Sequence, residues 1–122
     1  MLEHIGLTVV DYSEIKEFYQ DLLGFKLDYD FQISAELSEK MFGIEEKSRA
    51  YMLSKNGLKL ELFVSRQKNM SDYNHLCFSI KDREAFIQKA KEKGYEYTVI
   101  KRDKSDLVFI KDKSNNIFEI TK

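Results

Sequence analysis

The residues of this 122-residue chain that are best suited to chemistry are two histidines and two glutamates on strand-like segments. The chain has only two histidines, His4 and His75, and one lies near the start of each half. Each half ends in another strand-like segment that contains a glutamate, Glu61 or Glu119. Imidazole and carboxylate groups are ligands for zinc, nickel, cobalt, iron and manganese. The pattern therefore predicts a site for one divalent metal ion.

Alternation of apolar and polar residues places these four side chains on the same face of their strands. In residues 2–10 the apolar side chains point to one side, so His4 points to the other. The same alternation surrounds Glu61, His75 and Glu119. Any one of the four could be an ordinary residue of a solvated sheet. The matched set in both halves favours a metal site on the face opposite the core.

Each half of the chain has the same order of predicted elements. In the first half, a strand at 2–10 is followed by a helix at 13–23, where apolar residues recur at helical spacing. Ser13 could cap this helix, and Gly24 suits the left-handed position after its end. Three strands follow, at FKLDYDFQI, AYMLS and LKLELFVS, with a short helical segment at about 34–42 before the last two.

The second half repeats this order with a strand at HLCFSI, a helix at 82–93 and strands at YEYTVI, DLVFIKD and NIFEIT. An internal repeat is a strong indication of architecture. The sequence therefore predicts an α+β fold in which paired βαβββ modules form a curved mixed sheet. We expect a single domain over residues 1–122, with one module at about 1–66 and the other at about 73–122.

Composition and charge argue against several classes of function. The 20 basic and 21 acidic residues are mixed along the chain, so no basic stripe is expected to hold nucleic acid and no basic arm to hold a membrane. No apolar run approaches the length of a membrane span, and the opening MLEHIGLTVV lacks the basic start of a signal peptide. The single cysteine, Cys77, excludes a disulfide within the chain, so we expect a cytoplasmic protein. With nucleic acid and membranes excluded, we expect its partner to be a small molecule.

The segments around the four candidate ligands resemble those of the vicinal oxygen chelate superfamily, the glyoxalase and bleomycin-resistance fold. The resemblance rests on HIGLTV, EFYQDLLGFKL, LELF, HLCFSI and NNIFEI, and it covers essentially the whole chain. It implies that the family's four ligand positions fall on His4, Glu61, His75 and Glu119, around one Ni, Zn, Mn, Fe or Co ion. This ligand set is similar to that of glyoxalase I, which is lactoylglutathione lyase.

Glyoxalase I chemistry is therefore the first function that the resemblance implies. It would be a metal-dependent lyase or isomerase reaction on a small oxygen-chelating substrate, through an enediolate-like intermediate, with Glu119 and Glu61 as catalytic bases. An acyl-CoA epimerase, a thiol transferase, a dioxygenase and a non-catalytic antibiotic-binding protein of the same fold stay open. Glyoxalase I has a glutathione-binding arginine near the position of Thr8, so the use of glutathione also stays open.

Other residues of the ligand face would shape the substrate site. We expect these to be Thr8, Tyr51, Phe63, Ser79 and Phe109. The segment at about 34–42 resembles a substrate-covering insert, and Arg49 and Arg66 could hold an anionic group. The resemblance also implies a homodimer. The two modules could pair within one chain or between two chains.

Overall fold

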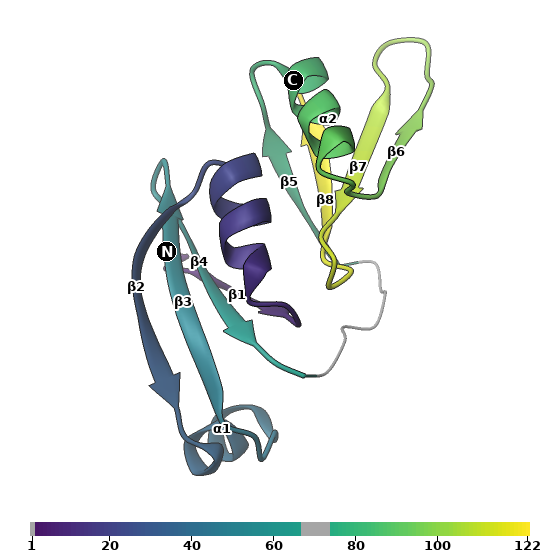
Figure 1. Cartoon of the computed structure of the whole chain (residues 1–122). Coiled ribbons are helices and arrows are strands. Elements are labelled where there is room, and N and C mark those ends of the chain that lie inside the picture. Colours follow the sequence, from purple (N-terminus) through teal and green to yellow (C-terminus); the bar gives the residue numbers. More distant parts are fainter. Residues whose placement is uncertain (1, 67–73) are drawn as a thin grey trace. The chain divides into compact units, whose positions relative to one another are not determined.

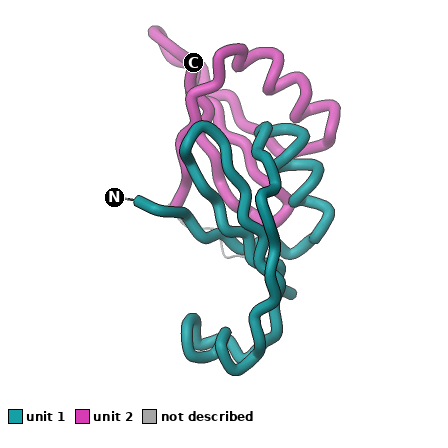
Figure 2. Tube along the Cα trace, turned by 90° about the vertical axis from the view of Figure 1, so that its left-hand side faces the viewer, with its two compact units in different colours: residues 1–68 teal, residues 69–122 magenta. Residues whose placement is uncertain are grey.

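The computed structural model describes residues 2–66 and 74–122 (Figure 1). The chain divides into two compact units, residues 1–68 and residues 69–122 (Figure 2). Each unit contains one βαβββ module with a four-stranded mixed sheet of its own. The predicted α+β fold of two such modules is confirmed. Residues 1 and 73, which the predicted module ranges include, lie outside the described residues.

The first unit has six helices and strands. They are β1 (Ile5–Val9), η1 (Ile15–Leu22), β2 (Lys26–Ile33), α1 (Ala35–Phe42), β3 (Ser48–Lys55) and β4 (Leu58–Val64). The strand order is β1-β4-β3-β2, with β1 parallel to β4 and the other neighbours antiparallel. The first and last strands of the module therefore lie side by side.

A two-residue turn sets the register of the hairpin formed by β3 and β4. Asn56 and Gly57 have positive φ values of 50° and 84°, which is the backbone that a tight two-residue hairpin turn requires. Lys55 therefore pairs with Leu58, and the pairing runs without a shift to the far end of the hairpin. This register decides which side chains of β3 share a face with those of β4.

The helix of the first unit differs in detail from the prediction of a helix at 13–23. The structure has a π-helix, η1, inside this range, and its buried side chains are those of Ile15, Phe18, Tyr19 and Leu22. The prediction that Ser13 caps the helix is wrong, because its N–H and its hydroxyl both donate hydrogen bonds to the Asp11 carboxylate, at 2.9 and 2.8 Å. Gly24 follows the helix with a φ of 80°, as predicted.

The second unit repeats the plan without the short helix before its hairpin. Its elements are β5 (His75–Ser79), α2 (Arg83–Glu92), β6 (Tyr97–Ile100), β7 (Leu107–Lys111) and β8 (Ile117–Thr121). The strand order is β5-β8-β7-β6, with β5 parallel to β8. Asp82 caps α2 as predicted, since its carboxylate accepts a hydrogen bond of 3.0 Å from the N–H of Ala85.

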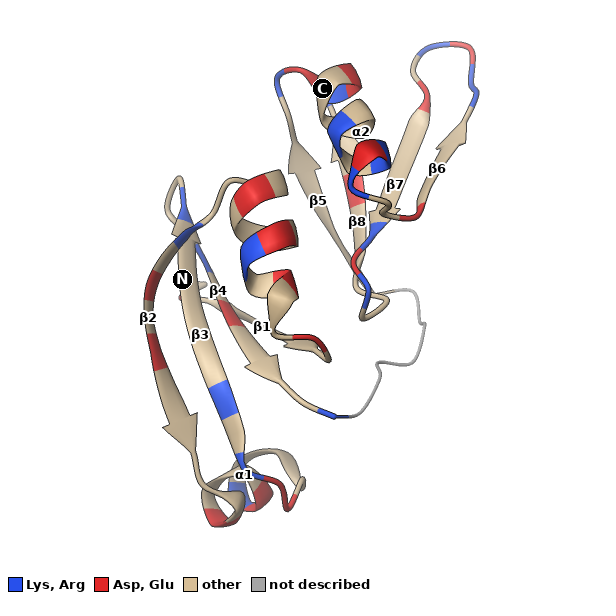
Figure 3. Ribbon diagram, in the orientation of Figure 1, with Lys and Arg blue, Asp and Glu red and all other residues tan. Residues whose placement is uncertain are grey.

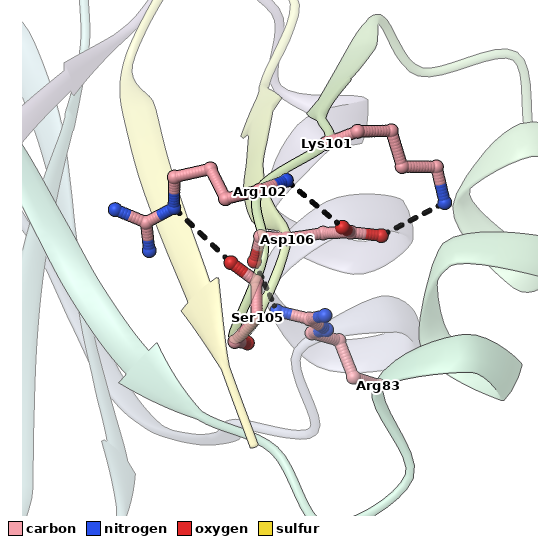
Figure 4. Close-up of polar contacts among 5 residues, drawn as sticks. All are labelled: Arg83, Lys101, Arg102, Ser105 and Asp106. Carbon is pink, nitrogen blue, oxygen red and sulfur yellow. Dashed lines mark hydrogen bonds and ion pairs between the residues drawn. The ribbon is translucent and has the colours of Figure 1, made fainter.

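The loop between β6 and β7 is tied to the start of α2 (Figure 4). Arg83 is buried, and its Nη1 donates to the carbonyl oxygens of Asp106, at 2.9 Å, and Ile120, at 3.4 Å. The Asp106 carboxylate accepts hydrogen bonds from Nζ of Lys101, at 2.9 Å, and from the N–H of Arg102, at 3.4 Å. The hydrogen bond from Lys101 holds the pKa of Asp106 below its usual range. These contacts anchor the β6–β7 loop to α2 and β8.

The core of each unit lies against one face of its sheet. The strand residues that are almost fully buried there include Val9, Leu60 and Leu62 in the first unit and Val108, Ile110, Phe118 and Ile120 in the second. Along β4 and β8 these core residues alternate with Glu61 and Glu119. The predicted alternation, with the glutamates on the opposite face from the core, is therefore present in both units.

Charged residues of both signs are interspersed along each unit (Figure 3). In the first unit, Lys16 pairs with Asp21 and Lys40 pairs with Glu36. No helix among the described residues is long and apolar enough to cross a membrane. The distribution of charged residues agrees with the predicted mixed charge pattern.

Candidate metal centre

The first candidate ligand pair joins His4, the residue just before β1, to the middle of β4. In the parallel register, Gly6 lies beside Glu61 and Thr8 lies beside Phe63. His4 precedes Gly6 by two residues, so strand alternation puts it on the same face. The imidazole Nε2 of His4 lies 3.9 Å from Oε1 of Glu61. The imidazole side chain is 44% exposed and the carboxylate side chain only 14%, so the pair lies at the surface of its unit with the glutamate recessed.

The second pair has the same construction. His75 begins β5, and Glu119 lies in β8 beside Cys77. The imidazole Nε2 of His75 lies 3.7 Å from Oε2 of Glu119, with side chains 45% and 24% exposed. The ring of Phe109 meets the His75 ring edge to face at 6.2 Å. This ring contact restricts the orientations of the imidazole on one side.

The geometry of each pair fits two ligands of one divalent ion. Two donors that are bonded to an ion at about 2.1 Å, at angles of about 90–120°, lie roughly 3.0–3.6 Å apart. The observed separations of 3.9 and 3.7 Å need only a small side-chain rotation to reach this range. The described residues contain no group of three or more His, Cys, Asp or Glu side chains that could hold a metal. Each unit therefore offers two ligands rather than a complete site.

Four of the five predicted substrate-binding residues share a face with a ligand pair of their own unit. Thr8 and Phe63 lie on the Glu61 face of the first sheet, since they are neighbours in the β1–β4 register. Phe109 is paired with Glu119, and Ser79 follows Cys77 by two residues on β5. The hydroxyls of Thr8 and Ser79 and the two phenyl rings thus line the same surface as the ligands of their own unit.

Tyr51 is the exception, and its predicted place beside the ligands is wrong. The hairpin register pairs Tyr51 with Leu62, which belongs to the core face, whereas Glu61 is paired with Met52. Met52 is therefore the β3 residue directly opposite Glu61, and sequence reasoning missed it. The signal was present in the two-residue Asn56–Gly57 turn, because counting outward from that turn gives the register.

The short helix α1 reaches the ligand face of the first sheet. Ser34 caps it by accepting a hydrogen bond of 3.1 Å from the N–H of Leu37. The ring of Phe42, near the end of α1, meets the Phe63 ring edge to face at 5.2 Å. Leu37, Met41 and Phe42 all remain about half exposed. The contact places the end of α1 beside Phe63, and a covering role for this segment stays a prediction.

Comparison with known families identifies the fold family. A sequence profile described as "Glyoxalase/Bleomycin resistance protein/Dioxygenase superfamily" matches residues 1–120. The chain belongs to this superfamily. No curated protein sequence matches this member of the glyoxalase/bleomycin resistance protein/dioxygenase superfamily.

Solved structures share the fold of this superfamily member at low sequence identity. A glyoxalase family protein from Enterococcus faecalis is 21% identical, with a TM-score of 0.75 over 100% of this chain and 97% of that one. A mutant of the fosfomycin resistance protein FosX from Listeria monocytogenes, complexed with Mn(II) and 1S,2S-dihydroxypropylphosphonic acid, is also 21% identical. Its TM-score is 0.79 over 99% of this chain and 90% of that one. FosX from Mesorhizobium loti is 15% identical, with a TM-score of 0.73 over 99% and 90%.

Proposed function

We propose that this protein is a metal-dependent enzyme that acts on a small substrate with two neighbouring oxygen atoms, with glyoxalase I-type lyase or isomerase chemistry as the first candidate. The observation that carries the proposal is the matched His–Glu pair in each module, with its members 3.9 and 3.7 Å apart. The recurrence of the pair at the same place in both modules favours a shared role over an incidental surface contact.

The proposed ligands of one divalent ion are His4 and Glu61 of one module and His75 and Glu119 of the other. Because each unit supplies only two ligands, the two modules would act together as one functional domain. They would pair within one chain or between the subunits of a homodimer. When bound, a divalent ion such as Ni, Zn, Mn, Fe or Co polarises substrate oxygens as a Lewis acid.

The two glutamates are the proposed catalytic bases. One oxygen of each carboxylate lies toward its histidine, at Oε1 of Glu61 and Oε2 of Glu119. The other carboxylate oxygen could take a proton from a substrate carbon and return it to a neighbouring atom. Such a base works best in a site that excludes water. Glu61, with its side chain 14% exposed, meets this condition better than Glu119.

The remaining residues of the ligand face would bind the substrate. Thr8 and Ser79 each offer a hydroxyl that can donate a hydrogen bond to a substrate oxygen. Phe63 and Phe109 offer aromatic surfaces for an apolar part of the substrate. Phe42 of α1 would cover the substrate through its contact with Phe63. This combination suits a small, oxygen-rich molecule with a short apolar portion.

Chemistry on a phosphonate such as fosfomycin is a second candidate, favoured by the solved structures. The FosX proteins of Listeria monocytogenes and Mesorhizobium loti share the fold over 98% or more of this chain. One of them holds Mn(II) together with 1S,2S-dihydroxypropylphosphonic acid, which carries two neighbouring hydroxyls and a phosphonate. The same proposed ligand set would suit such an oxygen-rich compound. Acyl-CoA epimerisation, dioxygenation and simple antibiotic binding are further outcomes that the experiment below separates.

The test is an assay of purified protein that has been reconstituted separately with Mn(II), Ni(II) and Zn(II). The substrates are the hemithioacetal of methylglyoxal and glutathione, methylmalonyl-CoA, a catechol, and fosfomycin with and without a thiol. We expect turnover of the hemithioacetal. A Glu119→Gln variant should lose about 10²–10⁴-fold in kcat, the usual contribution of a general acid–base residue.

The matched control is Glu84→Gln, which removes an exposed carboxylate from α2 of the same unit and should keep full activity. Turnover of fosfomycin alone would replace the first candidate by the second. Tight binding of fosfomycin without turnover in any metal form would contradict the enzymatic proposal. Equal activity of Glu119→Gln and Glu84→Gln would exclude Glu119 as a catalytic base.

A further inference from the structure

The first unit has a pocket on the side of its sheet that faces away from the His4–Glu61 pair. The pocket has a volume of about 280 Å³ and is lined by Tyr12, Gln32, Lys47, Ser48, Arg49, Tyr51 and Val64. In the hairpin register Arg49 is paired with Val64, and Tyr51 is paired with Leu62 of the core face. The walls come from β2, β3, β4, the loop after β1 and the loop before β3, so all of them belong to one unit.

Two cations line this pocket, and none of the seven lining residues is acidic. The Nε of Arg49 donates to Oδ2 of Asp30 at 2.5 Å, which fixes the guanidinium at the pocket wall. The neighbouring Asp30 also raises the pKa of Arg49 above its ordinary value. The Nε–H is used in this contact, and the guanidinium also hydrogen-bonds the Tyr51 side chain. The remaining N–H groups of the guanidinium are donors for a second anionic partner. Lys47 adds a second positive charge, and Asp30 neutralises one of the two.

Two tyrosine rings form the apolar part of the wall. The rings of Tyr12 and Tyr51 lie 5.6 Å apart, tilted by 59°. Tyr51 is buried, and burial raises the pKa of its phenol. Its hydroxyl can donate a hydrogen bond. Tyr12 is 64% exposed and stands at the open side. The Ser48 hydroxyl already donates to the carbonyl oxygen of Val64 at 2.9 Å. Ser48 therefore lines the pocket without offering a hydrogen-bond donor to a ligand.

We propose that this pocket binds a small organic acid whose carboxylate lies between Lys47 and Arg49 and whose flat ring lies against Tyr12 and Tyr51. The volume of about 280 Å³ lies just below the ordinary range of about 300–1,000 Å³ for ligand pockets, so the ligand is a single-ring acid rather than a nucleotide or a coenzyme. A planar guanidinium that an acidic residue already holds in place is well suited to a carboxylate. The site is separate from the proposed metal centre, because it uses the other face of the sheet.

The test is a titration of the full-length protein with sodium benzoate, followed by amide NMR shifts. We expect saturable shifts at the backbone amides of residues 47–51. Lys47→Gln and Tyr12→Leu should each weaken binding, with a loss of about 10-fold for the removed charge–carboxylate contact. Both side chains are exposed, so these changes leave the fold intact. Arg49→Gln should weaken binding further.

Lys59→Gln is the matched control, since it removes an exposed lysine of β4 that lies outside the pocket. This variant should bind benzoate as the unchanged protein does. Inorganic phosphate should bind more weakly than benzoate, because it has no ring to lie against the tyrosines. The proposal is overturned if benzoate gives no saturable shift, if Lys59→Gln weakens binding as much as Lys47→Gln, or if phosphate binds as tightly as benzoate. None of these readouts depends on metal or on turnover, so they stand apart from the proposed function.

Discussion

Replacing His75 with alanine weakens binding of a divalent metal ion by more than about 100-fold. Loss of a residue that only hydrogen-bonds to a metal ligand costs about 10–100-fold in affinity, and loss of the ligand itself costs more. The His75 imidazole lies 3.7 Å from Glu119 on a side chain that is 45% exposed. The variant should therefore keep nearly its full stability while it loses the metal. Competition against a coloured chelator, with Mn(II) and Ni(II), measures the change.

Asn74→Ala is the control for this variant, since residue 74 is exposed and neighbours His75 along the chain. It should retain metal affinity. His4→Ala should lose about as much affinity as His75→Ala, because the two His–Glu pairs are built alike. If His4→Ala left the affinity of the remaining metal unchanged and only halved the amount bound, the two pairs would hold separate ions. That result would contradict a shared site.

Replacing Phe118 with alanine lowers the free energy of unfolding by about 3–5 kcal/mol, the usual cost of removing a buried phenyl ring. Phe118 is fully buried, and its ring stacks on that of Phe78 at 5.8 Å. It also precedes Glu119 in β8, so the cavity would loosen the strand that presents this proposed ligand. Urea unfolding followed by circular dichroism measures the loss.

Ile100→Ala is the control for the same sheet, because Ile100 of β6 is 47% exposed. It should cost well under about 1 kcal/mol, as surface substitutions do. Equal losses for the two variants would mean that the second sheet does not use its Phe118 face as the core. The predicted orientation of Glu119 would then be wrong as well.

Local patterns predicted most of the fold correctly. The change from strand alternation to helical spacing gave the order of elements in both modules, and the Asn56–Gly57 turn appeared where it was expected. The capping of the first helix was mispredicted, because a serine two residues after an aspartate can bond to that carboxylate instead of to the helix. The spacing of apolar residues in 13–23 predicts a helix, but it does not indicate that the helix is a π-helix.

The candidate site was predictable within each module and not beyond it. Alternation gave the face of each histidine and glutamate, and the structure brings the members of each pair within 4 Å, at 3.9 and 3.7 Å. Tyr51 was misplaced because a shift of one position moves a side chain to the other face, and only the hairpin register resolves that choice. Alternation fixes a side chain's face only within its own sheet. For this reason the meeting of the two pairs around one ion stays a prediction.

The most direct test of the central claim is the metal content of the purified protein after reconstitution with Mn(II) or Ni(II) and removal of excess ion, measured by elemental analysis. Two His–Glu pairs that share one ion predict one equivalent per chain, lost in both His4→Ala and His75→Ala. Two equivalents per chain would show that each pair binds its own ion. No retained metal would contradict the metal-dependent function itself.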